Sequence, residues 1–326
     1  MKIRISFVTD GGKDMGMGHV MRSMVFASEV CHSNDILFVT SSDASVQSLI
    51  KSRGFKVEFV GDRREIGQIL EVNQVNVVII DRVTVDEGLT KGIKESIDAR
   101  IVIMDSESAA NRWADIVVNG LLTKEFKNEH YIDKTTETEY FCGPRYLILK
   151  SDFTRYSKNS VADPIDARKF LLIFGGSDPL NLTDKTLRGL VQTQDKPCEI
   201  ELILGPKFAF DKDIRRTIDK YQAHNRVHLF RNVDNVAELM WRNELIFTSP
   251  GLSMFEGLSV GSNVIVSPQN TLQRRVYDYL FQNYNKTPEI YQFFDESFIL
   301  TQRERKVHEM EIGRGRAEVI KAIIEL

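Results

Sequence analysis

Short apolar runs rich in β-branched residues alternate with stretches of helical spacing along the first half of the chain. The stretches between the runs place apolar residues at positions i, i+3 and i+4, which is typical of amphipathic helices. The strands predicted from this pattern are Ile3–Thr9, Ile36–Thr40, Lys56–Val60, Val75–Asp81, Ala99–Asp105 and Ile116–Asn119, and the helices are Val20–Cys31, Ala44–Ser52 and Ile66–Glu71. Strands alternating with helices indicate βαβ units and a parallel sheet that is covered on both faces.

The same alternation resumes after a polar break at residues 150–168, which contains Pro164 and has the character of a linker. Further strands are expected at Phe170–Phe174, Glu199–Leu204, Val227–Phe230, Leu245–Ser249 and Asn263–Val266. The pattern therefore predicts an α/β protein of two Rossmann-like, doubly wound domains. We place these domains at residues 1–155 and 169–302, with a linker at 156–168 and a C-terminal helical segment at 303–326.

Composition narrows the class of protein without identifying it. The chain has 326 residues, of which 42% are hydrophobic and 27% charged, as in globular proteins with two ordinary cores. The net charge of −3 gives no reason to expect a nucleic-acid partner. The three cysteines are widely separated, and no apolar run is long enough to cross a bilayer. We therefore expect a cytoplasmic protein with no integral membrane segment, no metal site and no obligatory protein partner.

A glycine-rich turn separates the first predicted strand from the first predicted helix. Its sequence, Gly16-Met-Gly18-His19-Val-Met-Arg22, brings His19 to the first turn of the helix. The positive end of the helix dipole favours a neutral imidazole there, which makes His19 a candidate general base. Two other interpretations stay open, in which the turn only packs the helix on the sheet or His19 only caps it. The dinucleotide fingerprint is absent, because Met21 stands at its third glycine.

Polar residues follow several of the predicted strands in the first half. Asp10, Asp81, Asp105 and Asn119 each stand at a strand end, and ligands of open parallel sheets bind at that edge. Aspartate and asparagine also cap loops and helices, so each of the four has a purely structural interpretation. Their occurrence on one edge favours a polar cleft that includes His19.

The second half contains two turns suited to an anion. In the first, Phe174-Gly175-Gly176-Ser177-Asp178-Pro179 precedes a helix whose start, Asn181–Asp184, resembles a capping box and whose amides are typical of a phosphate site. In the second, Ser253 and Glu256 again have capping-box spacing. Glu256 either closes that box or holds a ribose diol, as carboxylates do in nucleotide sites. Asp211-Lys-Asp213 is interpreted as a helix start rather than a metal-binding pair.

Taken together and in order, these motifs resemble those of the UDP-sugar hydrolases of pseudaminic acid biosynthesis and their spore-coat polysaccharide relatives. That family is similar in fold to the MurG glycosyltransferase. The segments that carry the resemblance are Asp10 with Gly16–Arg22, Val77–Asp81, Phe141–Leu149, Phe174–Asp178 with Asn181, Ser249–Glu256 and Ile312–Ala317. The resemblance implies a glycosyltransferase B-like fold, with two Rossmann-like domains facing a cleft.

The resemblance also implies a role for each matching position. His19 would activate the attacking water, and Glu256 would hold the ribose of a UDP-sugar substrate. The remaining sugar-side positions are Asp10, Gly16, Gly18, Arg22, Asp81, Asp105, Asn119, Gln269 and Asn270, and the nucleotide-side positions are Gly175, Gly176, Ser177, Asp178, Gly251 and Ser253. The implied reaction is hydrolysis of a UDP-linked 2,4-diacetamido-2,4,6-trideoxy sugar, with inversion and without metal or cofactor. The alternatives are a UDP-sugar-dependent glycosyltransferase of the same fold and a non-catalytic sugar-nucleotide binding protein.

The sequence departs from the family pattern on the sugar side. Arg82 and Val83 stand where a His-Tyr pair is usual, and Ser106 stands where a second aspartate is common. Gln269-Asn270 replaces an Asn-Gln pair. These departures leave the sugar open, and also the choice between hydrolysis and transfer, while nucleotide binding is less affected.

Overall fold

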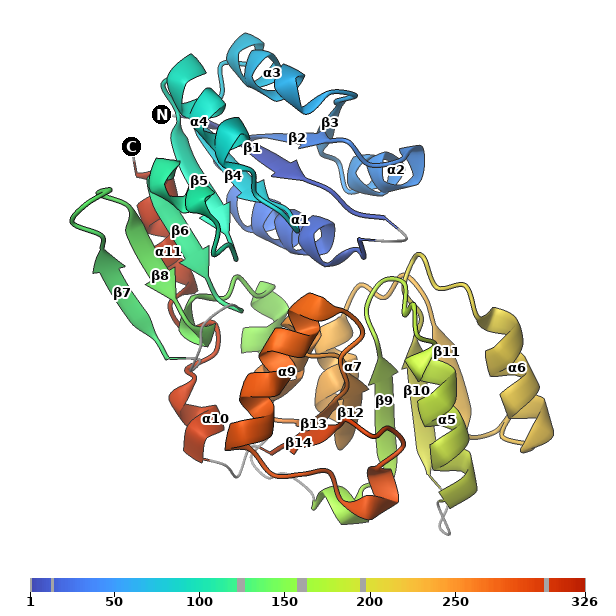
Figure 1. Cartoon of the computed structure of the whole chain (residues 1–326). Coiled ribbons are helices and arrows are strands. Elements are labelled where there is room, and N and C mark those ends of the chain that lie inside the picture. Colours follow the sequence, from blue (N-terminus) through green and yellow to red (C-terminus); the bar gives the residue numbers. More distant parts are fainter. Residues whose placement is uncertain are drawn as a thin grey trace. The chain divides into compact units, whose positions relative to one another are not determined.

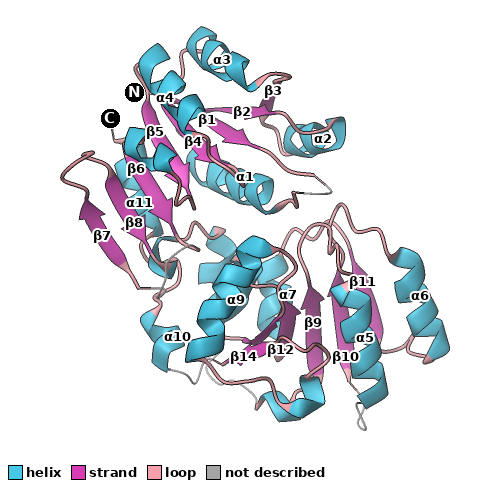
Figure 2. Ribbon diagram, viewed as in Figure 1, coloured by secondary structure: helices cyan, strands magenta, loops and turns pink. Residues whose placement is uncertain are grey.

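The computed structural model divides the chain into two units, each built on one sheet (Figures 1 and 2). It describes residues 2–12, 15–121, 127–156, 163–193, 198–301 and 305–325. The first unit comprises residues 1–150 and 310–326, and the second comprises residues 151–309. The expected linker at 156–168 is thus grouped with the second unit, although its residues 157–162 lie outside the described ones. The domain boundary expected at 302–303 also lies outside them.

The first unit contains an eight-stranded sheet in the order β3-β2-β1-β4-β5-β6-β8-β7. Its strands are β1 (Arg4–Thr9), β2 (Asp35–Thr40), β3 (Lys56–Phe59), β4 (Val77–Asp81), β5 (Arg100–Met104), β6 (Ile116–Asn119), β7 (Glu129–Ile132) and β8 (Glu139–Cys142). Its helices are α1 (Gly18–Val30), α2 (Ala44–Ser52), α3 (Ile66–Val72), α4 (Glu87–Ser96) and α11 (Arg316–Ile324), with 3₁₀ turns η1 (Arg63–Glu65), η2 (Ala109–Trp113) and η3 (Pro144–Tyr146). All neighbouring strands are parallel except β7 and β8, and the six predicted strands are confirmed.

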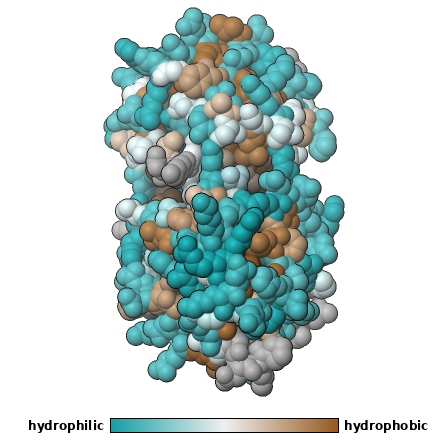
Figure 3. Space-filling view, turned by 90° about the vertical axis from the view of Figure 1, so that its right-hand side faces the viewer, coloured by the Kyte–Doolittle hydropathy of each residue, from teal (hydrophilic) through white to brown (hydrophobic). Residues whose placement is uncertain are grey.

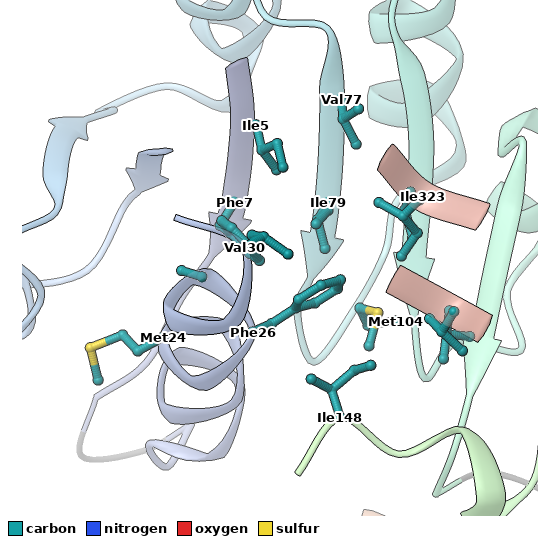
Figure 4. Packing of buried hydrophobic residues seen from close by; sticks show 14 of the residues in the cluster. Ile5, Phe7, Met24, Phe26, Val30, Val77, Ile79, Met104, Ile148 and Ile323 are labelled. Carbon is teal, nitrogen blue, oxygen red and sulfur yellow. The ribbon is translucent and has the colours of Figure 1, made fainter. Parts of the chain in front are cut away.

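Successive residues of the central strands point to opposite faces of this sheet, and both faces are buried. Val77 and Ile79 belong to a core cluster with α1, α2 and α11, whereas Val78 and Ile80 pack against α3 and α4. Figure 4 shows Phe26 of α1 pointing into the first cluster, near Ile79 and Met104. Burial on both faces explains why these strands read as continuous apolar runs.

The C-terminal segment expected at 303–326 is divided between the units, because residues 305–309 are grouped with the second unit and residues from 310 onward with the first. In the first unit, Val319 and Ile323 of α11 enter the core. Two glycines before the helix allow its close approach to the segment around η3. The amide of Gly313 donates to the carbonyl of Pro144 at 2.9 Å, and that of Gly315 donates to the carbonyl of Arg145 at 2.8 Å. This pairing accounts for two of the motifs in the sequence, because Phe141–Leu149 and Ile312–Ala317 lie against each other.

The second unit contains a six-stranded sheet in the order β11-β10-β9-β12-β13-β14. Its strands are β9 (Lys169–Ile173), β10 (Glu199–Ile203), β11 (Val227–Phe230), β12 (Leu245–Thr248), β13 (Asn263–Val266) and β14 (Phe298–Leu300). Its helices are α5 (Leu182–Thr193), α6 (Asp211–Lys220), α7 (Val236–Arg242), α8 (Leu252–Ser259), α9 (Thr271–Asn283) and α10 (Arg305–Glu309), with 3₁₀ turns η4 (Ser151–Thr154), η5 (Pro164–Asp166) and η6 (Glu289–Tyr291). All strand pairs are parallel except that of β13 and β14, and the five predicted strands are confirmed.

Helices cover both faces of the second sheet as well. Phe170, Leu172 and Leu202 share a core cluster with apolar residues of α5 and α6. Helices α7 and α8 lie against strands β9, β12 and β13. The two units together therefore form the predicted α/β architecture of two Rossmann-like sheets, each with one antiparallel edge strand.

None of the helices in the described ranges is both long enough and apolar enough to cross a membrane. On the face drawn in Figure 3, hydrophilic residues predominate, and the hydrophobic ones occur in separate patches.

The contact at Gly315 gives a test of the C-terminal docking. A Cβ atom there would lie 2.6 Å from Cδ1 of Tyr146, so Gly315→Ala should lower the free energy of unfolding by about 1–3 kcal/mol through overpacking. Gly92 is the matched control, because a Cβ at this helical position meets no atom within 4 Å. Gly92→Ala should stabilise the protein by about 0.5–1 kcal/mol. Denaturant unfolding of both variants measures these effects, and equal stabilities would contradict the docking role.

Candidate active site

Each sheet has one pair of neighbouring parallel strands from which the chain continues to opposite sides of the sheet. In the first sheet this pair is β1 and β4, and in the second it is β9 and β12 (Figure 1). The loops after such neighbouring strands separate, and ligands of open α/β sheets bind in the crevice they leave at the carboxyl ends. The residues of interest therefore fall into two groups, one at each position.

His19 reaches this edge of the first sheet through the turn between β1 and α1. Gly16 has a φ of 76°, in the left-handed region that favours glycine, and its carbonyl accepts from the amide of Gly12 at 3.0 Å. The amide of Gly11 donates to Oγ of Ser42 at 2.9 Å. Helix α1 begins at Gly18, so His19 lies in its first turn, as predicted.

The Asp81 carboxylate at the end of β4 receives four hydrogen bonds from the first turns of α1. Its Oδ1 lies 2.7 Å from Nδ1 of His19 and 2.5 Å from Nη2 of Arg22. Its Oδ2 accepts from Nε of Arg22 at 2.9 Å and from Oγ of Ser23 at 3.2 Å. Burial raises the pKa of Asp81, but the charges and hydrogen bonds of Arg22 and His19 outweigh it and bring the pKa below its usual value.

Ionisation of Asp81 fixes the tautomer of His19. An ionised carboxylate only accepts hydrogen bonds, so Nδ1 of His19 carries the hydrogen and donates it. In the neutral ring, Nε2 then holds the free lone pair. The side chain of His19 is 12% exposed, whereas that of Asp81 is 2% exposed. The pair is thus an imidazole oriented by a buried carboxylate.

Arg22 joins the ends of β4 and β5. Besides Asp81, its guanidinium contacts Oδ2 of Asp105, whose Oδ1 accepts from the amide of Leu121 at 2.8 Å. Burial lowers the pKa of Arg22, but the charges of Asp81 and Asp105 outweigh this effect and raise it above its usual value. Arg22 therefore stays charged, and we infer that it holds the two acids in place.

Asp10 and Asn119 are also satisfied within the chain. Oδ1 of Asp10 accepts from Ser41 through both its amide and its hydroxyl, at 2.7 and 2.9 Å, and from Oγ1 of Thr40 at 3.2 Å. Its Oδ2 pairs with the buried guanidinium of Arg82. The Asn119 side chain bonds both backbone atoms of Ser106, at 3.0 and 3.1 Å. These side chains shape the carboxyl edge of the sheet, and their polar atoms are paired with other residues of the first unit.

The glycine turn of the second unit follows β9. Gly175 has a φ of 81°, and the carbonyl of Gly176 accepts from the amide of Lys207 at 2.8 Å. Gly205, at the end of β10, lies so close that a Cβ there would be 2.4 Å from the carbonyl oxygen of Gly175. Ser177, which follows in the same turn, is buried.

The capping box expected at Asn181–Asp184 does not form. Asp178 caps α5 instead, because its two oxygens accept from the amides of Leu182 and Thr183, both at 2.8 Å. Asn181 has a φ of 51°, and Asp184 bonds Oγ1 of Thr217. Burial raises the pKa of Asp178, and the amide hydrogen bonds oppose that shift. The first amides of α5 are therefore already occupied by a carboxylate.

Helix α8 starts differently. Its N-cap is Gly251, which has extended backbone and makes no side-chain cap. Because the helix begins at Leu252, Ser253 lies inside it and is not the N-cap residue, so the capping-box interpretation of Glu256 is wrong. The amides of Leu252 and Ser253 have no acceptor in the part of the chain that the structure describes. An uncapped helix start of this kind suits an anion.

Gln269 connects the two turns of the second unit. Its Nε2 donates to the carbonyl of Phe174 at 3.0 Å and to Oγ of Ser249 at 2.9 Å, while its buried Oε1 has no partner among the described residues. Asn270 caps α9 by accepting from the amide of Gln273 at 2.9 Å. Gly175–Ser177, Ser249–Ser253 and Gln269 thus gather at the carboxyl edge between β9 and β12.

Several residues that support the two sheet edges were not predicted from the sequence. Ser23 and Ser41 bond the acids, and Gly205 makes room for the glycine turn. The sequence distinguishes Arg82 only as a residue that departs from a family pattern. The Asp211-Lys-Asp213 segment starts α6 as predicted, with Asp211 paired to Arg231 at 2.5 Å. Within the described residues, no group of three or more His, Cys, Asp or Glu side chains is arranged to hold a metal ion.

Solved structures with the same fold are glycosyltransferases and related sugar-nucleotide proteins. MurG of Acinetobacter baumannii superposes with a TM-score of 0.62 at 12% identity, covering 99% of this chain and all of that one. Anabaena HepE, solved in complex with UDP, gives a TM-score of 0.53 at 12% identity over the full length of both chains. The protein therefore has the glycosyltransferase B fold.

Sequence comparison finds three relatives, and no family model matches. Uncharacterized protein MJ1062 of Methanocaldococcus jannaschii is 37% identical over 99% of this chain, which spans 66% of that protein's length. SpsG, the spore coat polysaccharide biosynthesis protein of Bacillus subtilis, is 26% identical over 82% of this chain and 78% of its own. The UDP-2,4-diacetamido-2,4,6-trideoxy-beta-L-altropyranose hydrolase of Campylobacter jejuni is 22% identical over 80% of this chain and 90% of its own. The chain is a remote homologue of SpsG and of this hydrolase.

The Asp81 network gives a prediction on stability. Asp81→Asn should lower the free energy of unfolding by about 3 kcal/mol at pH 7, because it removes a buried charge that compensates Arg22. The pKa of Asp81 is lower in the folded state, so this stabilisation is present above about pH 4 and is lost as the pH falls further.

Denaturant unfolding at pH 7 and pH 3 measures this difference, which should shrink in acid. Asp219→Asn is the control, since the Asp219 side chain is 70% exposed. A difference between wild type and Asp81→Asn that does not change with pH would contradict the ionised, hydrogen-bonded state of Asp81.

Proposed function

We propose that the protein hydrolyses a UDP-linked amino or deoxy sugar of the 2,4-diacetamido-2,4,6-trideoxyhexose type, in nonulosonic acid or surface polysaccharide biosynthesis. The products are the free sugar, with inverted anomeric configuration, and UDP. Homology to the Campylobacter hydrolase supports the substrate class. The single observation that carries the chemistry is the 2.7 Å contact between Nδ1 of His19 and the Asp81 carboxylate.

In this proposal Nε2 of His19 takes a proton from the attacking water. The water oxygen forms a bond to the anomeric carbon while the bond from that carbon to the phosphate oxygen breaks, and UDP leaves with the electron pair. Asp81 stabilises the imidazolium that forms and holds the ring in the productive tautomer. Direct displacement by water inverts the anomeric centre, and the mechanism requires no metal.

The second unit supplies the nucleotide site in this proposal. Amides of Leu252 and Ser253, at the uncapped start of α8, contact the diphosphate and stabilise its charge as the bond breaks. Gly175, Gly176 and Ser177 border the same group. Glu256, one turn further along α8, accepts hydrogen bonds from the ribose hydroxyls. Asp178 has a supporting role, since its carboxylate shapes the turn by capping α5.

The first test of this function is UDP release from UDP-sugars without an acceptor. His19→Ala should lower the rate of release by about 10²–10⁴-fold, the usual contribution of a general base, and should leave UDP binding intact. His32→Ala is the matched control, because His32 is exposed on the loop after α1. NMR of the anomeric protons follows both the rate and the configuration of the product.

The outcomes separate the three candidate functions. Release that persists in His19→Ala argues against the proposed base. Turnover only when an acceptor sugar or lipid is added would make the protein a glycosyltransferase of this fold. UDP-sugar binding without turnover under either condition would leave a binding protein.

Glu256 is tested by binding. Glu256→Ala should weaken UDP binding by about tenfold or more, because two hydrogen bonds to a charged group are lost, and should change the melting temperature little. Calorimetric titration with UDP measures the first effect and thermal unfolding the second. Glu199→Ala, at the exposed start of β10, is the control. A large loss of stability with unchanged UDP affinity would assign Glu256 a structural role instead.

A further inference from the structure

Arg82 is a buried arginine at the carboxyl edge of the first sheet, directly after β4. Its side chain is 5% exposed, and the Asp10 carboxylate is its partner. Among the described residues the structure gives it no other hydrogen bond or ion pair. A guanidinium carries five N–H donors. No Arg82 nitrogen is among the fully buried side-chain atoms that lack a partner in the described residues, so the donors that do not face Asp10 are open to solvent. The side chain thus has donors available to a ligand, at the strand end where the preceding residue, Asp81, bonds His19.

Asp10 fixes the position of this guanidinium. One Asp10 oxygen is saturated by the three hydrogen bonds from Thr40 and Ser41, and the other faces Arg82. The acid therefore has no free oxygen for a substrate hydroxyl. The ion pair with Asp10 orients the Arg82 guanidinium, and it leaves part of the planar guanidinium group free to meet an oxygen atom of a ligand.

The charges around Arg82 discriminate between kinds of oxygen. Three buried carboxylates, Asp10, Asp81 and Asp105, face two buried guanidinium groups, Arg22 and Arg82. This set already has an excess of one negative charge. Arg63, whose charge acts on Arg82, is exposed and therefore screened by solvent. A neutral carbonyl oxygen is compatible with this set, whereas a further carboxylate would add to the excess.

We propose that Arg82 donates to the carbonyl oxygen of an acetamido group at C2 of the sugar, and so selects 2-acetamido sugars. This assignment rests on the proposed function. Arg82 follows Asp81, which holds the base, and C2 is the ring carbon next to the anomeric carbon. An acetamido carbonyl extends further from the ring than a hydroxyl oxygen does. Arg82 is then a specificity residue that contributes binding and takes no part in proton transfer.

The experiment compares the binding of UDP, UDP-glucose, UDP-N-acetylglucosamine and UDP-glucuronate by calorimetric titration. Wild type should bind UDP-N-acetylglucosamine at least about tenfold more tightly than UDP-glucose, the size expected for one charge-assisted hydrogen bond. Arg82→Lys keeps the charge opposite Asp10 but loses the planar fork. It should reduce this preference to about twofold and leave the affinity for UDP unchanged. Arg64→Lys is the control, because Arg64 is exposed and pairs with Asp62 at the surface.

Other outcomes overturn the assignment. A preference for UDP-N-acetylglucosamine that survives in Arg82→Lys, or no preference in wild type, removes the role of Arg82. If UDP-glucuronate binds most tightly, and if this binding depends on Arg82, then the ligand group of Arg82 is a carboxylate and not an acetamido carbonyl. If Arg82→Lys does not fold, the double variant Asp10→Asn/Arg82→Gln, which keeps the pair neutral, takes its place. If the protein does not bind UDP, both the proposed function and the assignment of Arg82 are wrong. If it prefers UDP-N-acetylglucosamine to UDP-glucose but releases no UDP, only the proposed hydrolysis is wrong.

Discussion

The buried carboxylate of Asp81 is the interaction on which the site of the first unit depends. It stands at the end of β4, and its four hydrogen bonds all come from residues in the first turns of α1. An ionised group at such depth is stable only where donors surround it, and Arg22 and His19 provide them. The same bonds fix the start of the helix against the strand and the orientation of the imidazole. The packing of α1 against β4 and the orientation of the imidazole therefore depend on one carboxylate.

The two sheets use the same topological position in different ways. Between β1 and β4 the edge is made by side chains, with saturated acids holding a histidine and an arginine. Between β9 and β12 it is made mainly by backbone, with glycines and an uncapped helix start. Side chains suit proton transfer, and amides suit a diphosphate, because they offer fixed dipoles without a titrating group. This division supports a nucleotide role for the second unit and a catalytic role for the first.

Much of the fold was predictable from the sequence, because burial leaves a local pattern. Strand β4 reads as an apolar run since both of its faces are covered. The pattern did not predict β7, whose four residues are all exposed, its neighbour β8, in which one residue of four is buried, or β14, which has only three residues. Strands β7 and β14 are at the edges of their sheets, and all three strands depend on pairing with a neighbour, which their short or partly exposed sequences do not indicate.

The candidate site was predictable only as a set of positions. The sequence identified the polar residues at the strand ends, and the structure places Asp81 and Asp105 around Arg22. It did not indicate which donors each acid would meet, because Ser41 and Leu121 arrive from other loops. The spacing of capping boxes gave wrong predictions for Asn181 and Ser253, since a shift of a helix start by a few residues changes which side chain can reach the free amides.

The hydrogen bonds and ion pairs of the three buried carboxylates affect which mechanism of displacement at the anomeric carbon the first unit could support. A retaining mechanism needs a carboxylate that attacks the anomeric carbon, and an inverting mechanism needs a base that activates water. The oxygens of Asp10, Asp81 and Asp105 already accept hydrogen bonds or ion pairs from the protein, so attack by any of them would break contacts that hold the sheet edge. In the proposed mechanism, Nε2 of His19 would take the proton without disturbing these contacts, because Asp81 bonds the other ring nitrogen, Nδ1. The network thus favours inversion by water over a covalent intermediate.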